Sequence, residues 1–431
     1  MQFYSTNSQN IKVGLKEAVL KGLAEDNGLY MPEQIPVLPE SFFNDIANKS
    51  LQEIGYEVLK PFFTPDIPED KFKELVDDAL DFEIPVVKVS DKKYALELFH
   101  GPTLAFKDVG ARFMARILSS FVCGQEKDIN ILVATSGDTG SAVANGFYKV
   151  PGINVFVLYP KGLVSEVQEK QFTTLGENIT AIEVDGTFDD CQRMVKQAFL
   201  DKELNEKMVL TSANSINLAR LLPQSIYYHH AYAQMRKNGI KDDVVMCVPS
   251  GNFGNITAGL IAQLMGLPVK RFIAATNIND IVPKYLESGQ YNPAPSKATI
   301  ANAMDVGDPS NFVRILDLYD AEHKVVTEKM EGYSYTDEQI RATLKRVDSD
   351  EAYVLDPHGA TGYMALEEGL KEGESGVFLE TAHPTKFPEV VEPEIGRSLE
   401  VPERLQAFMK GERKSVQMDT TLENLKDFLL K

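Results

Sequence analysis

Short apolar runs, each bounded by glycine, proline or polar residues, recur along the chain from Tyr94 onwards. Near-continuous runs of this kind are typical of strands that are buried on both faces of a parallel sheet. Segments with small and apolar faces, such as 140–148 and 257–264, predict helices between them. We therefore expect an open α/β fold, which binds ligands at the carboxyl ends of its strands. The predicted strands span residues 95–99, 129–135, 153–159, 179–185, 208–213, 244–249, 271–277 and 376–381.

The first 88 residues show a different pattern. Helical periodicity covers 16–23 and 71–80, while 28–40 and 61–70 are loops punctuated by proline. This stretch has no glycine-rich turn and no cluster of catalytic residue types. We expect a mostly helical N-terminal domain over 1–88 that acts as a cap or packing domain.

Charge and length narrow the function. The 431 residues suffice for two or three domains, and 44 basic against 63 acidic residues give a net charge of −19. So acidic a chain is a poor general binder of nucleic acid or anionic membranes. A phosphorylated small molecule would need a local site that overcomes this field.

Several residue types exclude further classes. The three cysteines, Cys123, Cys191 and Cys247, are scattered, which fits a reducing cytoplasm and gives no zinc motif. The histidines lack metal-binding spacing, and His229 and His230 lie in a helical segment, where a packing role is favoured. The N-terminus lacks the pattern of a signal peptide, and no apolar stretch approaches the roughly 18–20 residues of a membrane span. We expect a cytoplasmic protein without a bound metal.

A first strand-end loop contains His100-Gly101-Pro102-Thr103, followed by Lys107 and Asp108 at the start of an apolar helix. A lysine is disfavoured at the positive end of a helix, and its apolar neighbours would desolvate it and lower its pKa. Such a lysine suits covalent chemistry with an aldehyde cofactor. Taken alone, the motif favours a surface lysine that caps a loop.

A second loop runs from Thr135 through Ser136-Gly137-Asp138-Thr139-Gly140 into a helix of small residues. Backbone N–H groups, hydroxyls and the positive helix end can together hold a carboxylate or phosphate. The loop has neither the Walker pattern nor G-x-G-x-x-G. An ordinary strand–helix turn is the alternative.

A third loop, Ser250-Gly251-Asn252-Phe253-Gly254-Asn255, also lies between a strand and a helix. Its glycines would let the backbone approach an anion closely. Two such loops predict either a pair of ligands or one ligand with two anionic ends.

A fourth loop combines Asn214, Ser215 and Asn217 with Arg220 ahead of a helix. Arginine is the preferred bidentate partner of phosphate. A turn rich in Asn and Ser is usually a helix cap, and this loop taken alone favours the cap.

Together, HGPTLAFKD (100–108), TSGDTG (135–140) and PSGNFGN (249–255) resemble threonine synthases, which are pyridoxal-phosphate enzymes of fold type II related to the tryptophan synthase β subunit. The resemblance covers the whole chain. It implies two open α/β domains with the cofactor in the cleft between them, in addition to the N-terminal domain. The domains implied are a large one of 89–106 and 240–431 and a smaller one of 107–239.

The resemblance also assigns roles to individual residues. Lys107 matches the lysine that bonds to the cofactor aldehyde, and Thr381 matches the hydroxyl that meets the pyridine nitrogen. The remaining residues fall into a cofactor group and a substrate group. The cofactor group is Asp138, Ser250, Gly251, Asn252, Phe253, Gly254 and Asn255. The substrate group is Thr135, Ser136, Thr139, Asn214 and Arg220, with Arg112 and Lys161 as helpers.

Asp138 departs from many relatives, which have Asn at this position. An ionised carboxylate beside the phenolic oxygen of the cofactor would be repelled, so we expect Asp138 to be either protonated or turned away. Longer threonine synthases commonly carry this Asp, so the departure leaves the family assignment in place.

The resemblance implies a lyase of threonine biosynthesis that takes O-phospho-L-homoserine and water to L-threonine and phosphate. Lys107 would move protons at Cα and Cβ. A serine/threonine dehydratase or a cysteine synthase is the alternative with the same cofactor, and a phosphate- or nucleotide-binding module without catalysis is the alternative without it. Relatives include both monomers and dimers. We expect a monomer, with a homodimer as the alternative.

Overall fold

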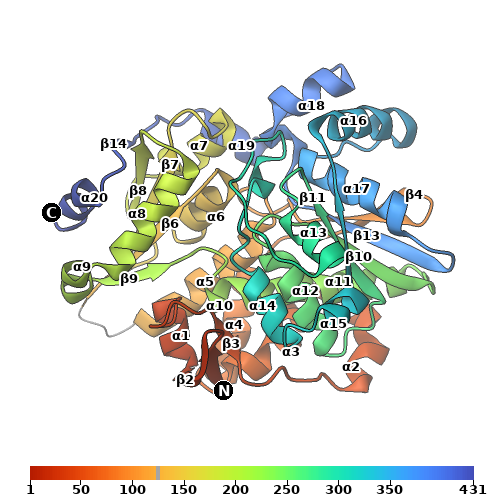
Figure 1. Cartoon of the computed structure of the whole chain (residues 1–431), viewed down its shortest axis with the longest axis horizontal. Coiled ribbons are helices and arrows are strands. Elements are labelled where there is room, and N and C mark those ends of the chain that lie inside the picture. Colours follow the sequence, from red (N-terminus) through yellow and green to blue (C-terminus); the bar gives the residue numbers. More distant parts are fainter. Residues whose placement is uncertain (123–126) are drawn as a thin grey trace. The chain divides into compact units, whose positions relative to one another are not determined.

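The computed structural model describes residues 1–122 and 127–431 (Figure 1). Contacts divide the chain into two compact units, each assembled from separate segments. Unit 1 consists mainly of Met31–Phe106 and Leu221–Glu400. Unit 2 consists of Gln2–Tyr30, Lys107–Arg220 and Val401–Lys431. The first 88 residues are thus shared between both units instead of forming a compact unit of their own.

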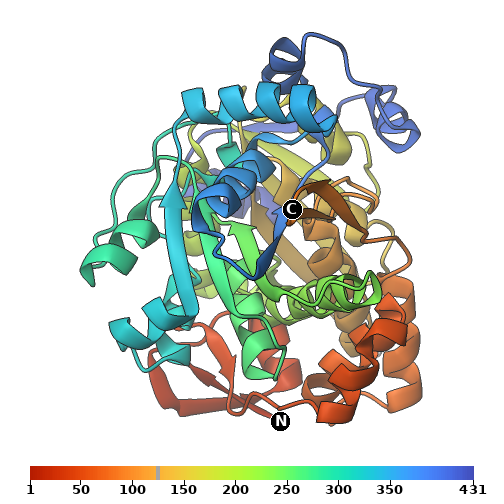
Figure 2. The same ribbon diagram turned by 90° about the vertical axis from the view of Figure 1, so that its right-hand side faces the viewer.

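Unit 1 is built on a six-stranded sheet with the order β12-β11-β10-β13-β5-β4 (Figures 1 and 2). The first five strands are parallel, and only β4 runs antiparallel to its neighbour. All seven residues of β10 except the first are buried, as the apolar run 244–249 predicts. The strands are β4 (Val86–Ser90), β5 (Lys93–Glu97), β10 (Asp243–Pro249), β11 (Arg271–Thr276), β12 (Met330–Ser334) and β13 (Glu374–Glu380).

Helices surround this sheet. The glycine-rich helix α17 (Pro357–Gly369) packs against β10, β11 and β13, and α11 (Ser225–Lys237) packs against both α3 (Leu51–Phe63) and α12 (Gly254–Leu264). The other α-helices of this unit are α2 (Glu40–Asp45), α4 (Glu69–Ala79), α13 (Ile281–Ser288), α14 (Phe312–Leu318), α15 (His323–Lys329), α16 (Asp337–Glu351) and α18 (Pro388–Ile395). Short 3₁₀ turns are η1 (Ile46–Asn48), η2 (Leu222–Gln224), η3 (Asn302–Met304) and η4 (Pro384–Lys386).

Unit 2 contains a five-stranded, wholly parallel sheet with the order β14-β8-β7-β6-β9. Its strands are β6 (Ile129–Ala134), β7 (Ile153–Pro160), β8 (Ile179–Val184), β9 (Val209–Ser212) and β14 (Val416–Met418). Its helices are α1 (Leu15–Lys21), α5 (Lys107–Val122), α6 (Asp138–Gly146), α7 (Glu166–Thr173), α8 (Phe188–Leu200), α9 (Lys202–Lys207), α19 (Glu403–Met409) and α20 (Leu422–Leu429). A short helix, α10 (Leu218–Leu221), ends at the boundary of the unit.

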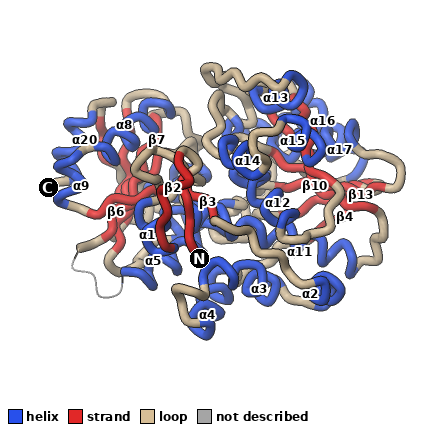
Figure 3. The backbone as a smooth tube through the Cα atoms, turned by 60° about the horizontal axis from the view of Figure 1, so that its bottom comes forward, coloured by secondary structure: helices blue, strands red, loops and turns tan. Residues whose placement is uncertain are grey.

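The N-terminal segment contains strands that its sequence pattern did not predict. Strands β1 (Gln2–Ser5) and β2 (Ser8–Gly14) pair in an antiparallel hairpin (Figure 3), and β3 spans Tyr30–Pro32. The predicted helices at 16–23 and 71–80 are present as α1 and α4. All eight predicted strands are also present, at boundaries shifted by a few residues at most. The strands of the two α/β sheets that were missed, β4, β12 and β14, lie at sheet edges, where apolar runs are short.

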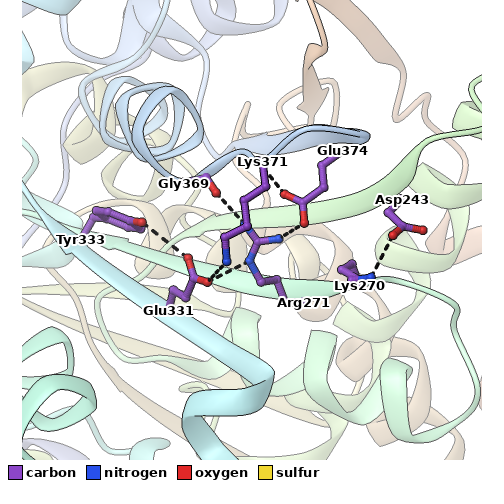
Figure 4. Close-up of polar contacts among 8 residues, drawn as sticks. All are labelled: Asp243, Lys270, Arg271, Glu331, Tyr333, Gly369, Lys371 and Glu374. Carbon is purple, nitrogen blue, oxygen red and sulfur yellow. Dashed lines mark hydrogen bonds and ion pairs between the residues drawn. The ribbon is translucent and has the colours of Figure 1, made fainter.

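The amino edge of the unit 1 sheet carries a network of charges (Figure 4). Arg271 begins β11 and donates to Glu331 Oε1 at 3.1 Å, to Glu374 and to the carbonyl of Gly369 at 2.6 Å. Lys371 completes the network with a bond of 3.0 Å to Glu331. The buried guanidinium is thus bonded to the second residue of β12, to the first residue of β13 and to the last residue of α17. These ion pairs link strands β11, β12 and β13 at the amino edge. Ligands of open α/β sheets bind at the opposite, carboxyl edge.

Candidate functional site

In unit 1, the loop between β10 and α12 presents a row of backbone donors. Phe253 adopts a left-handed conformation with φ 58°, and the helix begins at the next residue. The N–H groups that follow Ser250 have no acceptor among residues 1–122 and 127–431, whereas the N–H of Ile256 is taken by Asn255 Oδ1 at 2.9 Å. Successive amides of this kind at a helix N-terminus form an anion site. The donors belong to Gly251, Asn252, Phe253, Gly254 and Asn255.

Neighbouring residues fix the shape of this loop, which we call the cradle (residues 250–255). The N–H of Ser250 donates to the carbonyl of Ala275 at 2.9 Å. Asn255 Nδ2 donates to the carbonyl of Pro249 at 2.8 Å. At Gly251 a Cβ atom would lie 2.4 Å from the carbonyl oxygen of Ala303, so only glycine fits there. The cradle is therefore preformed, and its free amides do not depend on a ligand for their position.

Thr381 directly follows β13, the strand that neighbours β10 and so the cradle. Cys247 of β10 pairs with Phe378 of β13, and Ser250 and Thr381 each follow three residues later. Two groups at the same level on neighbouring parallel strands suit the two ends of one small ligand. The Thr381 hydroxyl makes no hydrogen bond within the described part of the chain, so it is available to a ligand.

Lys107 is tied to this strand end through its neighbour in sequence. The N–H of Phe106 donates to the carbonyl of Thr381 at 2.8 Å, and Ala105 pairs with Ala382 in a β-bridge. Lys107 follows directly, as the first residue of α5, and is half-buried. The backbone therefore sets the predicted lysine one residue away from the strand end that carries Thr381.

In unit 2, the loop after β6 is partly self-satisfied. The buried hydroxyl of Thr135 accepts hydrogen bonds from the N–H groups of Gly137 at 2.9 Å and Gly140 at 2.8 Å. The N–H and hydroxyl groups of Ser136 and Thr139 have no partner among the described residues, and both side chains are half-buried. The loop thus keeps a smaller set of donors, which suits a carboxylate.

Asp138 is held by a residue that sequence reasoning missed. Gln168 Nε2 donates to Asp138 Oδ1 at 2.9 Å, and Ser165 Oγ donates to Gln168 Oε1 at 3.1 Å, which fixes the orientation of the amide. Asp138 therefore serves as a hydrogen-bond acceptor on at least one oxygen. The Ser165-x-x-Gln168 spacing is a helix-capping signature and was the signal in the sequence that could have found this contact.

Arg220 lies close to α5, the helix that begins with Lys107, and Asn214 contacts the residue that precedes the Thr135 loop. Arg220 Nη1 donates to the carbonyl of Ala213 at 2.5 Å, and Gly110 of α5 lies so close that an added Cβ would be 2.8 Å from the Arg220 carbonyl. Asn214 Nδ2 makes a long bond of 3.4 Å to the carbonyl of Ala134, which precedes the Thr135 loop. Burial lowers the pKa of Arg220 to about 10, while Asp108 opposes that shift. The guanidinium is still charged at neutral pH.

The two helper residues are placed less closely. Arg112 lies on α5, four residues after Asp108 and so on the same face of the helix, and is half-buried. Lys161 follows β7, the neighbour of β6 in the sheet, and its side chain is exposed. The strand register brings Lys161 to the same sheet edge as the Thr135 loop.

Residues outside these loops have structural surroundings. His229 is buried in α11 between Phe42 and Phe43, and its Nδ1 donates to the carbonyl of Ser225 at 2.9 Å. Cys191 and Cys247 are buried, and Cys123 lies outside the described residues. Within residues 1–122 and 127–431 we find no cluster of His, Cys, Asp or Glu with metal-binding geometry. The same residues contain no helix with the length and apolar character that a membrane span requires.

Comparison with known proteins decides the family. A family model described as "Pyridoxal-phosphate dependent enzyme" matches residues 89–381, and models for the threonine synthase N terminus and C-terminal region match residues 2–80 and 359–429. Threonine synthase from Haemophilus influenzae is 46% identical over 431 residues, with 100% of both chains covered. The chain belongs to the threonine synthase family.

Solved structures of the family agree. The crystal structure of threonine synthase from Escherichia coli matches with a TM-score of 0.94 at 42% identity, covering 100% of this chain and 99% of that chain. Pyridoxal-phosphate-bound threonine synthase from Brucella melitensis matches with a TM-score of 0.92 at 34% identity, covering 100% and 98%. The predicted family, fold class and cofactor are confirmed. The free amides of the cradle and the free Thr381 hydroxyl fit pyridoxal phosphate, whose phosphate and ring nitrogen need such partners.

Proposed function

We propose that this enzyme converts O-phospho-L-homoserine and water into L-threonine and phosphate, with Lys107 as its catalytic base and acid. The observation that carries the assignment is the 2.8 Å bond from the Phe106 N–H to the Thr381 carbonyl. It supports the proposal because Lys107 follows Phe106 directly in the sequence, and this bond ties the Phe106 backbone to the strand end beside the cradle. The similarity to threonine synthases over the full chain supports the same reaction.

The cradle and Thr381 would hold the cofactor at its two ends. Five backbone N–H groups without acceptors in the described part of the chain can bind a phosphate without any cationic side chain, because charge-assisted bonds to an anion are stronger than neutral ones. A threonine hydroxyl, unlike a carboxylate, does not hold the pyridine nitrogen protonated. Asp138 belongs to this group by the same proposal, and its bond to Gln168 orients it.

Pyridoxal phosphate supplies an electron sink that stabilises negative charge at the substrate Cα. The Lys107 amine then removes the proton from Cα and afterwards one from Cβ. The Cγ–O bond would then break, and phosphate would leave with the bridging oxygen. A proton delivered to Cγ would form the methyl group, water would add at Cβ, and a proton returned to Cα would complete L-threonine. A primary amine suits both proton transfers because it can accept and return a proton without leaving the site.

The substrate would be held by the groups of unit 2. Ser136 and Thr139 offer N–H and hydroxyl donors to the α-carboxylate. Arg220 offers a buried cation to the substrate phosphate. Asn214 fits its assigned role less directly, since its Oδ1 is buried without a partner in the described chain while Nδ2 already contacts Ala134. The Thr135 hydroxyl accepts hydrogen bonds from two N–H groups of the loop, and in this proposal it holds the loop that carries Ser136 and Thr139.

The reaction is tested by incubating the full-length enzyme with O-phospho-L-homoserine and measuring both released phosphate and the amino acid formed. We expect equal amounts of phosphate and threonine. Turnover of serine or threonine to keto acids without phosphate release would instead support a dehydratase.

A second test addresses the substrate phosphate. Arg220→Ala should raise KM strongly while the absorbance of bound cofactor stays unchanged. A KM equal to that of the wild type would contradict the assignment of Arg220.

A cytoplasmic location and a monomeric state, with a homodimer as the alternative, also belong to the proposal. The unpaired Cys191 and Cys247 support the first, and sedimentation of the purified enzyme tests the second.

A further inference from the structure

A buried aspartate and histidine lie behind the cradle in unit 1. Asp356 is fully buried and caps the N-terminus of α17, where Oδ1 accepts the N–H of Gly359 at 2.6 Å. Its other oxygen, Oδ2, lies 2.6 Å from His358 Nδ1. His358 is only 2% exposed. Because a carboxylate accepts, the proton of the imidazole is on Nδ1, and Nε2 is left as an acceptor.

His358 Nε2 accepts a hydrogen bond from the backbone of the loop that contains Ala303. It accepts the N–H of Ala303 at 3.2 Å, across 55 positions of sequence. The carbonyl of the same Ala303 residue is the group that approaches Gly251, and the Cα of Met304 would lie 2.9 Å from a Cβ at that glycine. The Asp356–His358 pair thus fixes the Ala303 backbone, and that backbone forms the wall against which the first amide of the cradle is packed.

The loop that contains Ala303 also holds the next cradle residue. The N–H of Ser310 donates to Asn252 Oδ1 at 3.0 Å, and the N–H of Asn311 donates to the Asn252 carbonyl at 3.2 Å. Asp305 anchors the same loop to the sheet edge through a bond of 2.8 Å from Asn277 Nδ2. A loop fixed at these points cannot shift at Ala303 without moving Gly251 and Asn252.

The same aspartate reaches the strand that ends at Thr381. The N–H of Asp356 donates to Glu380 Oε2 over a long 3.4 Å, and Glu380 immediately precedes Thr381. Burial and the neighbouring Asp356 raise the pKa of Glu380 well above its usual range. The pair therefore contacts both the loop that packs on the cradle and the residue that precedes Thr381.

We propose that His358 is a positioning residue for the cofactor phosphate, acting through the Ala303 backbone on Gly251 and the cradle amides, with Asp356 fixing its tautomer. This inference rests on the proposed assignment of residues 250–255 to the phosphate. His358 touches neither the cofactor nor the substrate. Its removal should weaken binding of the phosphate while leaving the covalent chemistry of the aldehyde unaffected.

Two substitutions separate the two hydrogen bonds of the ring. His358→Asn keeps a donor where Nδ1 lies and loses the acceptor for Ala303. His358→Gln keeps an acceptor where Nε2 lies and loses the donor to Asp356. The measured quantities are the dissociation constants of the full-length, cofactor-depleted enzyme for pyridoxal phosphate and for pyridoxal, which lacks the phosphate.

We expect His358→Asn to weaken pyridoxal phosphate about tenfold or more, because a misplaced cradle loses charge-assisted bonds, while pyridoxal binding changes less than about twofold. His358→Gln should stay within about threefold of the wild type for both ligands. An unchanged affinity of His358→Asn for pyridoxal phosphate would overturn the proposal. Equal losses for the two ligands would also overturn it, since they indicate a general structural role.

Two further variants keep the outcome decisive. Gly251→Ala tests the cradle itself: if it does not weaken pyridoxal phosphate selectively, the assignment of the phosphate fails independently of His358. If His358→Asn does not fold, Asp356→Ser replaces it, because serine retains the helix cap and removes only the partner of Nδ1. A selective loss of phosphate affinity in Asp356→Ser supports the proposal, and wild-type affinity contradicts it.

Discussion

Two loops with the same spacing, Ser-Gly-x-x-Gly, follow parallel strands in the two units, yet they offer different numbers of donors. Residues 250–254 begin a cradle with five N–H groups that have no acceptor among the residues that the structure describes. In residues 136–140, two of the equivalent groups, the N–H of Gly137 and of Gly140, are already bonded to the Thr135 hydroxyl. The first loop can surround a phosphate, whereas the second is suited to a smaller carboxylate.

The residue in front of each loop explains the difference. Thr135 has a hydroxyl that turns back onto the loop, while Pro249 has no side-chain acceptor and uses its carbonyl to hold Asn255. The spacing of glycines therefore does not determine how strongly a strand–helix turn binds anions. What determines it is whether a neighbouring side chain consumes the amides first.

The largest expected effect separates chemistry from anion binding in both loops. Lys107→Ala should reduce kcat about 10³-fold or more, since the only proposed proton carrier is removed. Both loops should still bind their anions, so pyridoxal phosphate should remain bound without a covalent link. Turnover is measured by phosphate release, and borohydride should no longer attach the cofactor to the chain. Retention of more than a tenth of the activity would contradict the assigned role.

The next effect makes the cradle resemble the other loop. Pro249→Thr introduces a hydroxyl at the position equivalent to Thr135, where it can take two of the free amides. Losing two charge-assisted hydrogen bonds should weaken pyridoxal phosphate about 100-fold. Pro249→Val, which has the shape without the hydroxyl, is the matched control and should bind much more tightly. Equal affinities of the two variants would break the comparison.

The reverse change acts on stability. Thr135→Val leaves the N–H groups of Gly137 and Gly140 without their acceptor at a buried position. We expect the free energy of unfolding to fall by about 2 kcal/mol, measured by urea denaturation. Thr135→Ser keeps the hydroxyl and should lose less than half as much. A stable Thr135→Val variant would mean that the loop does not need its own hydroxyl to be held.

The smallest effect distinguishes the units by pH. All six histidines belong to unit 1, and burial lowers the pKa of His229 to about 4. Below pH 6.5 the native state then binds fewer protons than the unfolded chain. The free energy of unfolding is therefore fully retained above pH 6.5 and decreases as the pH falls towards 4. For His229 the loss between pH 7.5 and 5.5 should be about 1 kcal/mol.

Amide hydrogen exchange checks this pH effect, after correction for the intrinsic rates. Protection of α11 and of α12, which packs against it, should fall on acidification, while protection of β6 and β7 in unit 2 should not. His229→Phe, which preserves the aromatic packing with Phe43, should remove that part of the acid sensitivity. Uniform loss of protection in both units would contradict the prediction.

The sequence predicted the strands of both sheets where burial on two faces imposes a continuous apolar run, as in β10. It did not predict β12 or β14. Each of these strands lies at a sheet edge and pairs with only one other strand, so its sequence lacks a continuous apolar run. The four loops at strand ends were found from their glycines and polar residues. The contact from His358 to Ala303 was not, since residues 55 positions apart meet only through the tertiary fold. The difference between Thr135 and Pro249 was visible in the sequence and acquires its meaning only from the hydrogen bonds.

The reaction is tested most directly by turnover in water enriched in ¹⁸O. The account places C–O cleavage at Cγ and addition of solvent water at Cβ. It therefore predicts that the hydroxyl oxygen of the threonine formed comes from the enriched water, while the released phosphate carries none. Enrichment of the phosphate would show cleavage of the P–O bond, as in a phosphatase, and would contradict the assigned chemistry.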